Sequence, residues 1–314
     1  MRRVLITGAG GFVGSHCATY AAAAGLEPYL VDKPGAGKAP SDGYFYADLL
    51  NTKSVTQLVR DIRPTLLLHL AWITRHNEFW TSAENEIWVE SSYHLLKTFG
   101  QFGGHRAVLV GTCAEYDWRR AGVCNEFSTP VEPQTAYGRA KDRLRREAAE
   151  HASDVGMSLA WARLFFLYGP RENPNRLIPW VIRHLLAGEP ADCTPGTQIR
   201  DLLYVSDVAE AVISLLLSSV TGPVNIGSGH PTTLRDAVTQ TAEIIGRPDL
   251  LRFGARPMPA GEPPRLVADT GRLNNEVHWR PRVSLRDGLL ETVAYWKLRG
   301  EPPGVTPGQS NRTS

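Results

Sequence analysis

Three residues in this sequence can transfer or tune a proton. Tyr137 and Lys141 are four positions apart, so they share one face of a helix predicted over residues 135–155. A lysine ammonium beside a phenol favours the phenolate and lowers the pKa of the tyrosine. Tyr137 would then act as a general acid or base near neutral pH. Thr112 follows the strand predicted over residues 106–111, where its hydroxyl can bridge Tyr137 and a substrate oxygen. Each feature alone has an ordinary structural explanation, since helices carry such pairs by chance and threonines often begin turns.

A glycine-rich segment directly after the first predicted strand (residues 3–7) indicates a site for a pyrophosphate. Gly8, Gly11 and Gly14 open the next helix, predicted over residues 12–24. Glycines allow the backbone to approach a ligand, and the helix N-terminus offers unpaired N–H groups and the positive end of its dipole. The spacing is GxxGxxG rather than GxGxxG, so a plain strand–helix turn stays the alternative.

Two aspartates end predicted strands. Asp32 ends the strand over residues 28–32, where a carboxylate accepts both ribose hydroxyls of an adenosine. Because this charge disfavours a 2′-phosphate, it predicts NAD as cofactor, although Lys33 next to it leaves NADP open. Asp48 follows the strand over residues 44–47 and can meet the adenine amino group. The alternatives are a turn-starting and a strand-end aspartate.

The elements that must position these residues alternate between short apolar runs and helical patterns. That alternation is typical of an α/β protein with a parallel sheet and crossover helices. Continuous apolar strands such as LLLHL and AVLVG suit a sheet covered on both faces. The remaining predicted elements are helices over residues 83–102, 177–187, 208–218, 234–245 and 285–298, and strands over residues 65–70, 159–164 and 202–205.

Proline and arginine become more frequent after about residue 165. The sequence therefore predicts a doubly wound (Rossmann) cofactor domain over residues 1–165, with residues 203–232 returning to it. A smaller substrate-binding lid is predicted mainly over residues 166–300. The composition of residues 301–314 predicts a disordered tail.

The bulk composition excludes several classes of function. Hydrophobic residues make up 42% and charged residues 21%, and 34 basic against 32 acidic residues give a net charge of +2. This balance predicts neither nucleic acid nor an anionic membrane as partner, and the basic run over residues 139–146 also fits a solvated helix face. No apolar stretch approaches the roughly 18 residues of a membrane span, and the N-terminal apolar run is too short for a signal peptide. Four scattered cysteines predict reduced thiols in a cytoplasmic protein without a metal site.

Eight motifs occur in a family-specific order. They are TGAGGFVG at residues 7–14, Asp32, HLA at 69–71, GTCAEY at 111–116, YGRAK at 137–141, RLFFLYGPRENPNRLIPWVI at 163–182, RDLLYVSDVAEA at 200–211 and VNIGSG at 224–229. With them the chain resembles, over about residues 3–298, the extended short-chain dehydrogenases/reductases. Within these it is similar to the NAD-dependent epimerase/dehydratase group, which acts on nucleotide sugars.

The resemblance implies a hydride exchanged between the nicotinamide and a sugar carbon. Tyr137 would pass the proton, Lys141 would hold the nicotinamide ribose and Thr112 would orient the sugar oxygen. Cofactor contacts are implied for Gly8, Gly11, Phe12, Val13, Gly14, Asp32, Lys33, Asp48, Leu49, Leu70, Ala71, Tyr137 and Lys141.

Substrate contacts are expected from a second set of residues, namely Thr112, Cys113, Ala114, Phe166, Arg176, Arg200 and Arg265. Arg200 corresponds to an arginine that grips the nucleotide diphosphate in relatives, and Arg265 is a looser candidate for the same task. Arg176 is a third phosphate contact or only caps the lid helix. The resemblance also implies a homodimer through the helices over residues 83–102 and 135–155.

Departures from the family pattern narrow the range of reactions that we expect of this chain. Sugar 4,6-dehydratases carry Asp-Glu directly after the catalytic threonine, whereas this chain has Cys113 and Ala114, which do not remove water in that way. Phe166 stands near the place where epimerases often have an asparagine, and Ser91-Ser92 replaces the usual Gly-Thr. The segment GTCAEYDW is most similar to reducers of 4-keto sugar nucleotides. We therefore expect a sugar-nucleotide 4-ketoreductase, with an NAD-retaining epimerase or an idle cofactor-binding protein as alternatives.

Overall fold

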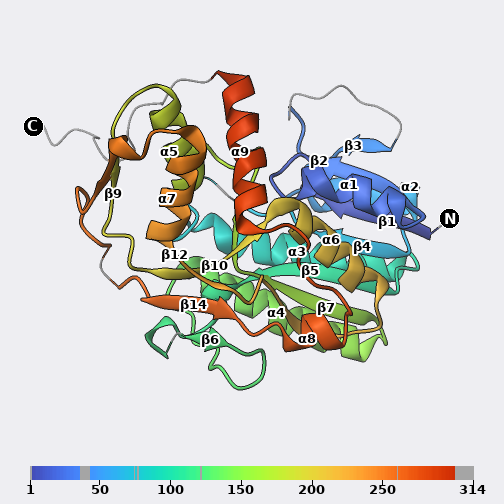
Figure 1. Ribbon diagram of the computed structural model, residues 1–314. Coiled ribbons are helices and arrows are strands. Elements are labelled where there is room, and N and C mark those ends of the chain that lie inside the picture. Colours follow the sequence, from blue (N-terminus) through green and yellow to red (C-terminus); the bar gives the residue numbers. More distant parts are fainter. Residues whose placement is uncertain are drawn as a thin grey trace, which may run out of the picture.

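Seven parallel strands form the larger sheet of the molecule (Figure 1). The computed structural model describes residues 2–35, 43–73, 75, 78–120, 122–259 and 261–300. The strand order is β11-β7-β5-β4-β1-β2-β3, which is the doubly wound arrangement with one added strand. The strands are β1 (Arg2–Thr7), β2 (Leu26–Asp32), β3 (Tyr44–Tyr46), β4 (Leu66–His69), β5 (Arg106–Thr112), β7 (Ser158–Leu164) and β11 (Gly222–Ile226). The predicted α/β class with a parallel sheet is confirmed.

Helices cover both faces of this sheet, which explains why its strands are almost wholly apolar. One face packs against α2 (Thr52–Ile62), α3 (Glu84–Gln101) and α4 (Ala136–Asp154). The other face packs against α1 (Gly14–Ala23), α6 (Val205–Leu217) and α8 (Gly271–Asn275). Helix α2 was not predicted from the sequence, although Asn51 caps it by accepting hydrogen bonds from two backbone N–H groups.

A second, smaller sheet belongs mostly to the later half of the chain. Its strands are β12 (Pro231–Thr233), β10 (Ile199–Tyr204), β14 (Arg265–Ala268), β6 (Val123–Cys124) and β8 (Phe166–Tyr168). A separate pair is formed by β9 (Ala191–Cys193) and β13 (Leu251–Phe253). Most of these strands have two to four residues, too few for a periodic pattern to show in the sequence.

Three longer helices of the later half pack against one another, from the left to the middle of the view in Figure 1. They are α5 (Leu177–Leu186), α7 (Leu234–Ile245) and α9 (Leu285–Arg299). Thr233 and Ser284 cap α7 and α9 by accepting backbone hydrogen bonds, as their positions before the apolar runs predict. Short 3₁₀ turns are η1 (Cys113–Glu115), η2 (Trp118–Arg120) and η3 (Pro248–Leu250).

The chain returns to the first sheet late in the sequence. Strand β11 pairs with β7 in parallel, from Gly222 opposite Ala160 to Ile226 opposite Leu164. The division into a cofactor domain and a lid stays a prediction, and the predicted tail over residues 301–314 lies outside the described residues. In the part of the chain that the structure describes, no helix is both long and apolar enough to cross a membrane.

Candidate active site

The carboxyl ends of four neighbouring strands bring the predicted site residues to one edge of the sheet. Thr7 at the end of β1 lies opposite Val31 of β2 and His69 of β4. Thr112 at the end of β5 lies opposite Leu164 of β7. The segments that follow β1, β2, β4 and β5 therefore meet at this edge, where open α/β sheets bind their ligands.

The glycine loop after β1 is packed so closely that side chains do not fit. Gly8 has φ +70°, and a Cβ on it would lie 2.9 Å from the amide nitrogen of Ala71. A Cβ on Gly14 would lie 2.1 Å from the carbonyl oxygen of Gly8. Gly11 is less confined, since its nearest neighbour would be 3.1 Å away. Helix α1 begins at Gly14, two residues later than predicted, with Phe12 and Val13 half-buried in the preceding turn.

Gly10, which the sequence prediction left out, contacts the acidic residue of the next strand. Its N–H donates to Asp32 Oδ2 at 2.9 Å, and a Cβ on it would lie 2.0 Å from that oxygen. The spacing of Gly8 and Gly10, a GxG, was the signal available in the sequence. The hydroxyl of Tyr44 also donates to Asp32 at 3.3 Å. Burial, followed by the charge of Asp32, raises the pKa of Tyr44 to about 12.

The remaining cofactor candidates lie around this loop at different depths. Lys33 is exposed, and its N–H donates to Asp32 Oδ1 at 2.8 Å. Asp48 is exposed in the turn after β3 and accepts a hydrogen bond from the N–H of Leu50, while Leu49 beside it is buried. Ala71 is half-buried and donates its N–H to Thr7 Oγ1 at 3.3 Å. Leu70 packs against the core beneath the loop.

A buried histidine fixes the end of β4. His69 Nδ1 lies 2.7 Å from Thr7 Oγ1, and its Nε2 lies 2.8 Å from Ser92 Oγ on α3. Burial, and then the charge of Lys141, lowers the pKa of His69 to about 3. His69 is therefore neutral at pH 7 and ties the site to α3.

Thr112 and Tyr137 come together from two different elements. Thr112 is the last residue of β5 and caps η1 with its side chain. Tyr137 lies in the first turn of α4, which Thr135 caps by accepting the N–H of Gly138 at 3.0 Å. The side chains of Thr112 and Tyr137 share a hydrogen bond. The structure thus joins two of the three predicted catalytic residues directly.

Lys141 does not act on Tyr137 as the sequence reasoning expected. Burial raises the pKa of Tyr137 far above its ordinary value, and the hydrogen bond with Thr112 acts in the opposite direction. Lys141 Nζ donates to the carbonyl oxygen of Val110 at 2.8 Å and lies 3.7 Å from the ring centroid of Trp72. Burial lowers the pKa of Lys141 to about 7, while Glu115 acts to raise it. The expected lowering of the tyrosine pKa was wrong for this structure, because the ammonium is directed to a carbonyl and an indole.

Aromatic side chains surround Tyr137. The ring centroids of Phe79, Trp80 and Trp72 lie 5.0, 5.7 and 6.5 Å from that of Tyr137, each in an edge-on arrangement. Trp118 continues the group, 5.9 Å from Trp80. None of these four was predicted, since a single tryptophan or phenylalanine in a sequence does not identify a pocket wall.

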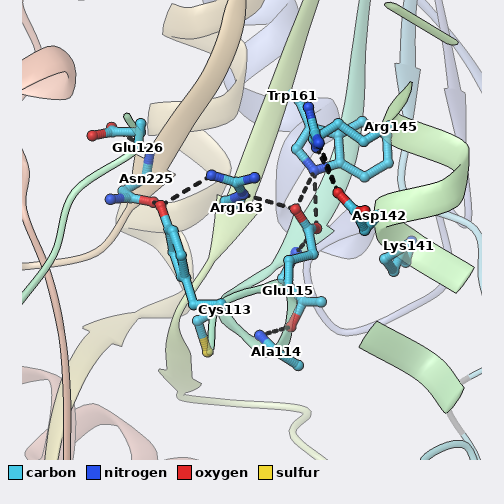
Figure 2. A network of polar contacts seen from close by, with 12 residues as sticks. Cys113, Ala114, Glu115, Glu126, Lys141, Asp142, Arg145, Trp161, Arg163 and Asn225 are labelled. Carbon is cyan, nitrogen blue, oxygen red and sulfur yellow. Dashed lines mark hydrogen bonds and ion pairs between the residues drawn. The ribbon is translucent and has the colours of Figure 1, made fainter. Parts of the chain in front are cut away.

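The two residues after Thr112 are buried. Cys113 and Ala114 form the start of η1, and burial raises the pKa of the Cys113 thiol well above its ordinary value. The thiol is therefore protonated at neutral pH and unsuited to nucleophilic attack. Figure 2 shows Glu115, which follows them, pointing toward Trp161 and Arg163 of β7. The sequence analysis did not single out this glutamate.

The predicted substrate residues fall into two groups. Arg176 is exposed at the start of α5 without capping it, and its guanidinium lies 5.7 Å from the ring centroid of Phe79. Arg200 is buried, lies over the ring of Phe166 at 5.1 Å and pairs with Glu262 at 2.7 Å. Arg176 therefore faces the aromatic group near Tyr137, whereas Arg200 lies in the second sheet.

A polar cluster surrounds Arg200. Gln198 Nε2 donates to Glu262 Oε2 at 3.3 Å, and Arg265 begins the neighbouring strand β14 opposite Ile199. Gln198 Oε1 and Arg265 Nε are buried and have no hydrogen-bond partner in the protein. Each of these two orphaned groups, an acceptor and a donor, is one that a polar ligand could satisfy.

The two helices expected to form a dimer face place much of their apolar surface in the core of the monomer. Leu95, Leu144 and Ala148 are buried between α3, α4 and the sheet, and Trp88 packs against the same cluster. Their apolar character is thus explained by core packing. On the basic run of α4, Arg143 forms ion pairs with Glu86, Glu90 and Glu147. Such internal pairing agrees with a solvated face.

Comparisons with known proteins identify the family. The model of the "NAD dependent epimerase/dehydratase family" matches residues 4–227. A Bacillus subtilis protein described as an uncharacterized UDP-glucose epimerase is 25% identical over 316 residues, covering 93% of this chain and 97% of the relative. UDP-glucuronic acid decarboxylase 6 of Arabidopsis thaliana is 27% identical, covering 95% and 89%.

Among solved structures, UDP-glucose 4-epimerase of Thermus thermophilus in complex with NAD is 26% identical. It superposes with a TM-score of 0.79 over 94% of this chain and 99% of that one. The family match covers most of the seven-stranded sheet together with Thr112, Tyr137 and Lys141. This chain belongs to the NAD-dependent epimerase/dehydratase family of enzymes.

Proposed function

We propose that this enzyme uses NADH to reduce the 4-keto group of a nucleotide-activated 6-deoxyhexose. One observation carries the proposal. The hydrogen-bonded pair of Thr112 and Tyr137 is followed by Cys113 and Ala114, a buried protonated thiol and a methyl group. These four side chains can supply one proton to one sugar oxygen. They include no second acid–base pair that could remove water from the sugar. Oxidation or reduction at a single carbon is the chemistry that remains.

The residues of the first strand and loop fit a dinucleotide. Gly8, Gly10 and Gly14 leave no room for side chains, so backbone N–H groups are accessible to a pyrophosphate above α1. Asp32 would accept the adenosine ribose hydroxyls, and its charge favours NADH over NADPH. Lys141 would hold the nicotinamide ribose, with Leu70 and Ala71 packed beside it. The bound cofactor supplies the hydride at the nicotinamide.

Tyr137 donates its phenolic proton to the sugar oxygen as the carbonyl is reduced. A raised tyrosine pKa suits this direction, because the phenol is protonated at neutral pH and ready to act as an acid. Thr112, hydrogen-bonded to Tyr137, orients the carbonyl oxygen. The aromatic group of Phe79, Trp80 and Trp118 suits the apolar methyl group of a 6-deoxy sugar.

The nucleotide end of the substrate is assigned to the polar cluster in the second sheet. Arg200 and Arg265 supply positive charge for the diphosphate, and Glu262 is a hydrogen-bond acceptor for hydroxyls. The orphaned Arg265 Nε is a donor that such a ligand would satisfy. Arg176 is a further candidate for a substrate contact, since its guanidinium lies 5.7 Å from the ring centroid of Phe79, which packs against Tyr137.

An NAD-retaining epimerase is the second candidate, favoured by the names of the relatives in Bacillus subtilis and Thermus thermophilus. An epimerase must let the 4-keto sugar turn, so that either face of C4 meets the nicotinamide. We infer that the aromatic side chains packed edge-on against Tyr137 would restrict such a turn. This restriction supports the reductase.

The experiment follows the loss of NADH and NADPH absorbance with dTDP-, CDP- and GDP-linked 4-keto-6-deoxy sugars. We expect oxidation of NADH with one of them, and none in Tyr137→Phe. Interconversion of UDP-hexoses without added cofactor, by protein purified with NAD bound, would replace the reductase with the epimerase.

We further propose a cytoplasmic homodimer. The four cysteines are buried and free, which suits a reducing compartment. Helices α3 and α4 lie side by side, and Ile87 on α3 is 51% exposed. Light scattering at micromolar concentration should give twice the mass of the chain, and Ile87→Glu should shift it toward the monomer.

A further inference from the structure

A buried carboxylate lies directly behind the catalytic threonine. Glu115 is fully buried, and its Oε1 accepts the backbone N–H of Thr112 at 2.8 Å. The N–H of Ala114 in turn donates to Thr112 Oγ1 at 3.2 Å, so threonine and glutamate cap η1 reciprocally. The position of the Thr112 backbone thus depends on the carboxylate of Glu115.

Two side chains from the neighbouring strand hold that carboxylate in place. Arg163 Nε donates to Glu115 Oε2 at 2.7 Å, and Trp161 Nε1 donates to both oxygens at 2.9 and 3.1 Å (Figure 2). Gly111 is confined by the same group, because a Cβ on it would lie 2.0 Å from Trp161 Nε1 and 2.4 Å from Glu115 Oε1. Four donated hydrogen bonds on one buried carboxylate leave it little freedom to move.

The network extends from Arg163 into the second sheet. Arg163 Nη1 donates to the hydroxyl of Tyr116 at 3.1 Å, and that hydroxyl donates to Asn225 Oδ1 at 2.7 Å. The N–H of Asn225 donates to Glu126 Oε1 at 2.8 Å, and its Nδ2 donates to the carbonyl of Cys124 in β6. The loop carrying Thr112 is therefore tied through side chains to both sheets.

Glu115 also places a negative charge beside the reacting groups, since it accepts the N–H of Thr112 while Lys141 donates to the carbonyl of Val110, two residues earlier on the same strand. It acts to raise the pKa of both Tyr137 and Lys141. The other groups acting on them are Cys113 and Arg176 for Tyr137, while Lys141 in turn acts on His69 of β4. Arg163 of β7 pairs with the same carboxylate at 2.7 Å.

We propose that Glu115 is a positioning residue for the reduction, which fixes the Thr112 backbone and places a negative charge beside Lys141. This inference rests on the proposed function. It separates into two parts, the position of the carboxylate and its charge, and each can be changed without the other.

The first variant removes the charge and keeps the hydrogen bonds. In Glu115→Gln combined with Arg163→Met, the glutamine oxygen still accepts from Thr112 and Trp161, and no buried cation is left unpaired. Charged Lys141 is expected to bind the nicotinamide ribose, so NADH affinity should fall as pH rises through its pKa. In the double variant that fall should occur about 1 pH unit lower. NADH fluorescence titrations between about pH 5 and 9 measure it.

The second variant keeps the charge and moves it. In Glu115→Asp the shorter side chain loses the Thr112 N–H, so kcat should fall about 10-fold or more with the NADH inflection unchanged. The matched control is Arg106→Met at the opposite end of β5, where a buried guanidinium donates to backbone carbonyls of α6. This control should lower the melting temperature without moving the inflection.

The titration decides the charge part of the inference even if the sugar substrate is wrong. A wild-type protein that binds NADH but reduces no sugar nucleotide would defeat the proposed function alone. The role of the Glu115 charge would be overturned by either of two results. The NADH affinity could show no inflection with pH, or the inflection could fall at the same pH in wild type and double variant. A full kcat in Glu115→Asp would overturn its role in position.

Discussion

Two loops at the same edge of the sheet are built on opposite principles. The glycine loop, residues 8–14, is defined by the absence of side chains, since added carbons would lie 2.0–2.9 Å from neighbouring atoms at three positions. The catalytic loop, residues 111–116, is defined by buried polar side chains, with Glu115 accepting from three residues. The glycine loop should tolerate the loss of a charge but not an added atom. The catalytic loop should be sensitive above all to the loss of a polar atom.

Removing one oxygen near the catalytic loop should have the largest effect. Tyr137→Phe keeps the aromatic packing with Phe79 and Trp80 but removes the proton donor. We expect kcat to fall about 10³-fold, with the melting temperature nearly unchanged. Steady-state kinetics and thermal unfolding on the same preparation measure this. A retained kcat would mean that another group donates the proton.

Adding one carbon to the glycine loop should come next. Gly14→Ala places a Cβ 2.1 Å from Gly8 O and 2.8 Å from the Cα of Ala9, both rigid backbone atoms. We expect a loss of about 3 kcal/mol in the free energy of unfolding and weak NADH binding. Denaturant unfolding measures the first and fluorescence titration the second. The control is Gly122→Ala, whose Cβ would meet no atom within 4 Å. Equal stability of the two variants would contradict the comparison.

Removing the buried ammonium should stabilise the protein while inactivating it. The pKa of Lys141 is lowered from 10.5 to about 7, so between these values the unfolded chain binds a proton that the folded chain does not. The free energy of unfolding of wild type should therefore rise with pH across this window. Lys141→Met should add about 2 kcal/mol at pH 7 and progressively less toward pH 10. Unfolding at several pH values checks the slope, and a constant difference would refute it.

Removing a charge beside the glycine loop should have the smallest effect. In Asp32→Asn the amide oxygen can still accept the N–H of Gly10. We expect NADH affinity to fall about 10-fold, by roughly 1.4 kcal/mol, and the preference over NADPH to shrink. Parallel titrations with both cofactors measure it. A loss as large as that of Gly14→Ala would show that charge matters as much as space in this loop.

The sequence predicts those parts of the site that depend on local spacing. Gly8, Asp32 and Thr112 follow strands whose apolar runs are readable, and Tyr137 and Lys141 share a helix face at four residues' separation. The family assignment and the parallel sheet follow from the same local patterns. Among these, only the expected lowering of the Tyr137 pKa by Lys141 differs from the structure.

The parts that escaped prediction depend on contacts between distant segments. Glu115 and Arg163 are 48 positions apart, and Lys141 meets Trp72 and the carbonyl of Val110 from another strand. Spacing carries no signal for such pairs. The strands of the second sheet are too short for a period to appear, and the limits of α1 shifted because the glycine turn runs to Val13.

The late return of the chain to the first sheet has a consequence for synthesis on the ribosome. One face of that sheet, including Val4, Leu66 and Val108, is covered largely by α6 and completed by β11. Until about residue 226 has emerged, this apolar surface faces solvent or a chaperone. A nascent chain that stalls after β7 would already carry Tyr137 and Lys141, yet it would be prone to aggregate. The catalytic half can therefore complete its fold only after more than two thirds of this chain has been synthesised.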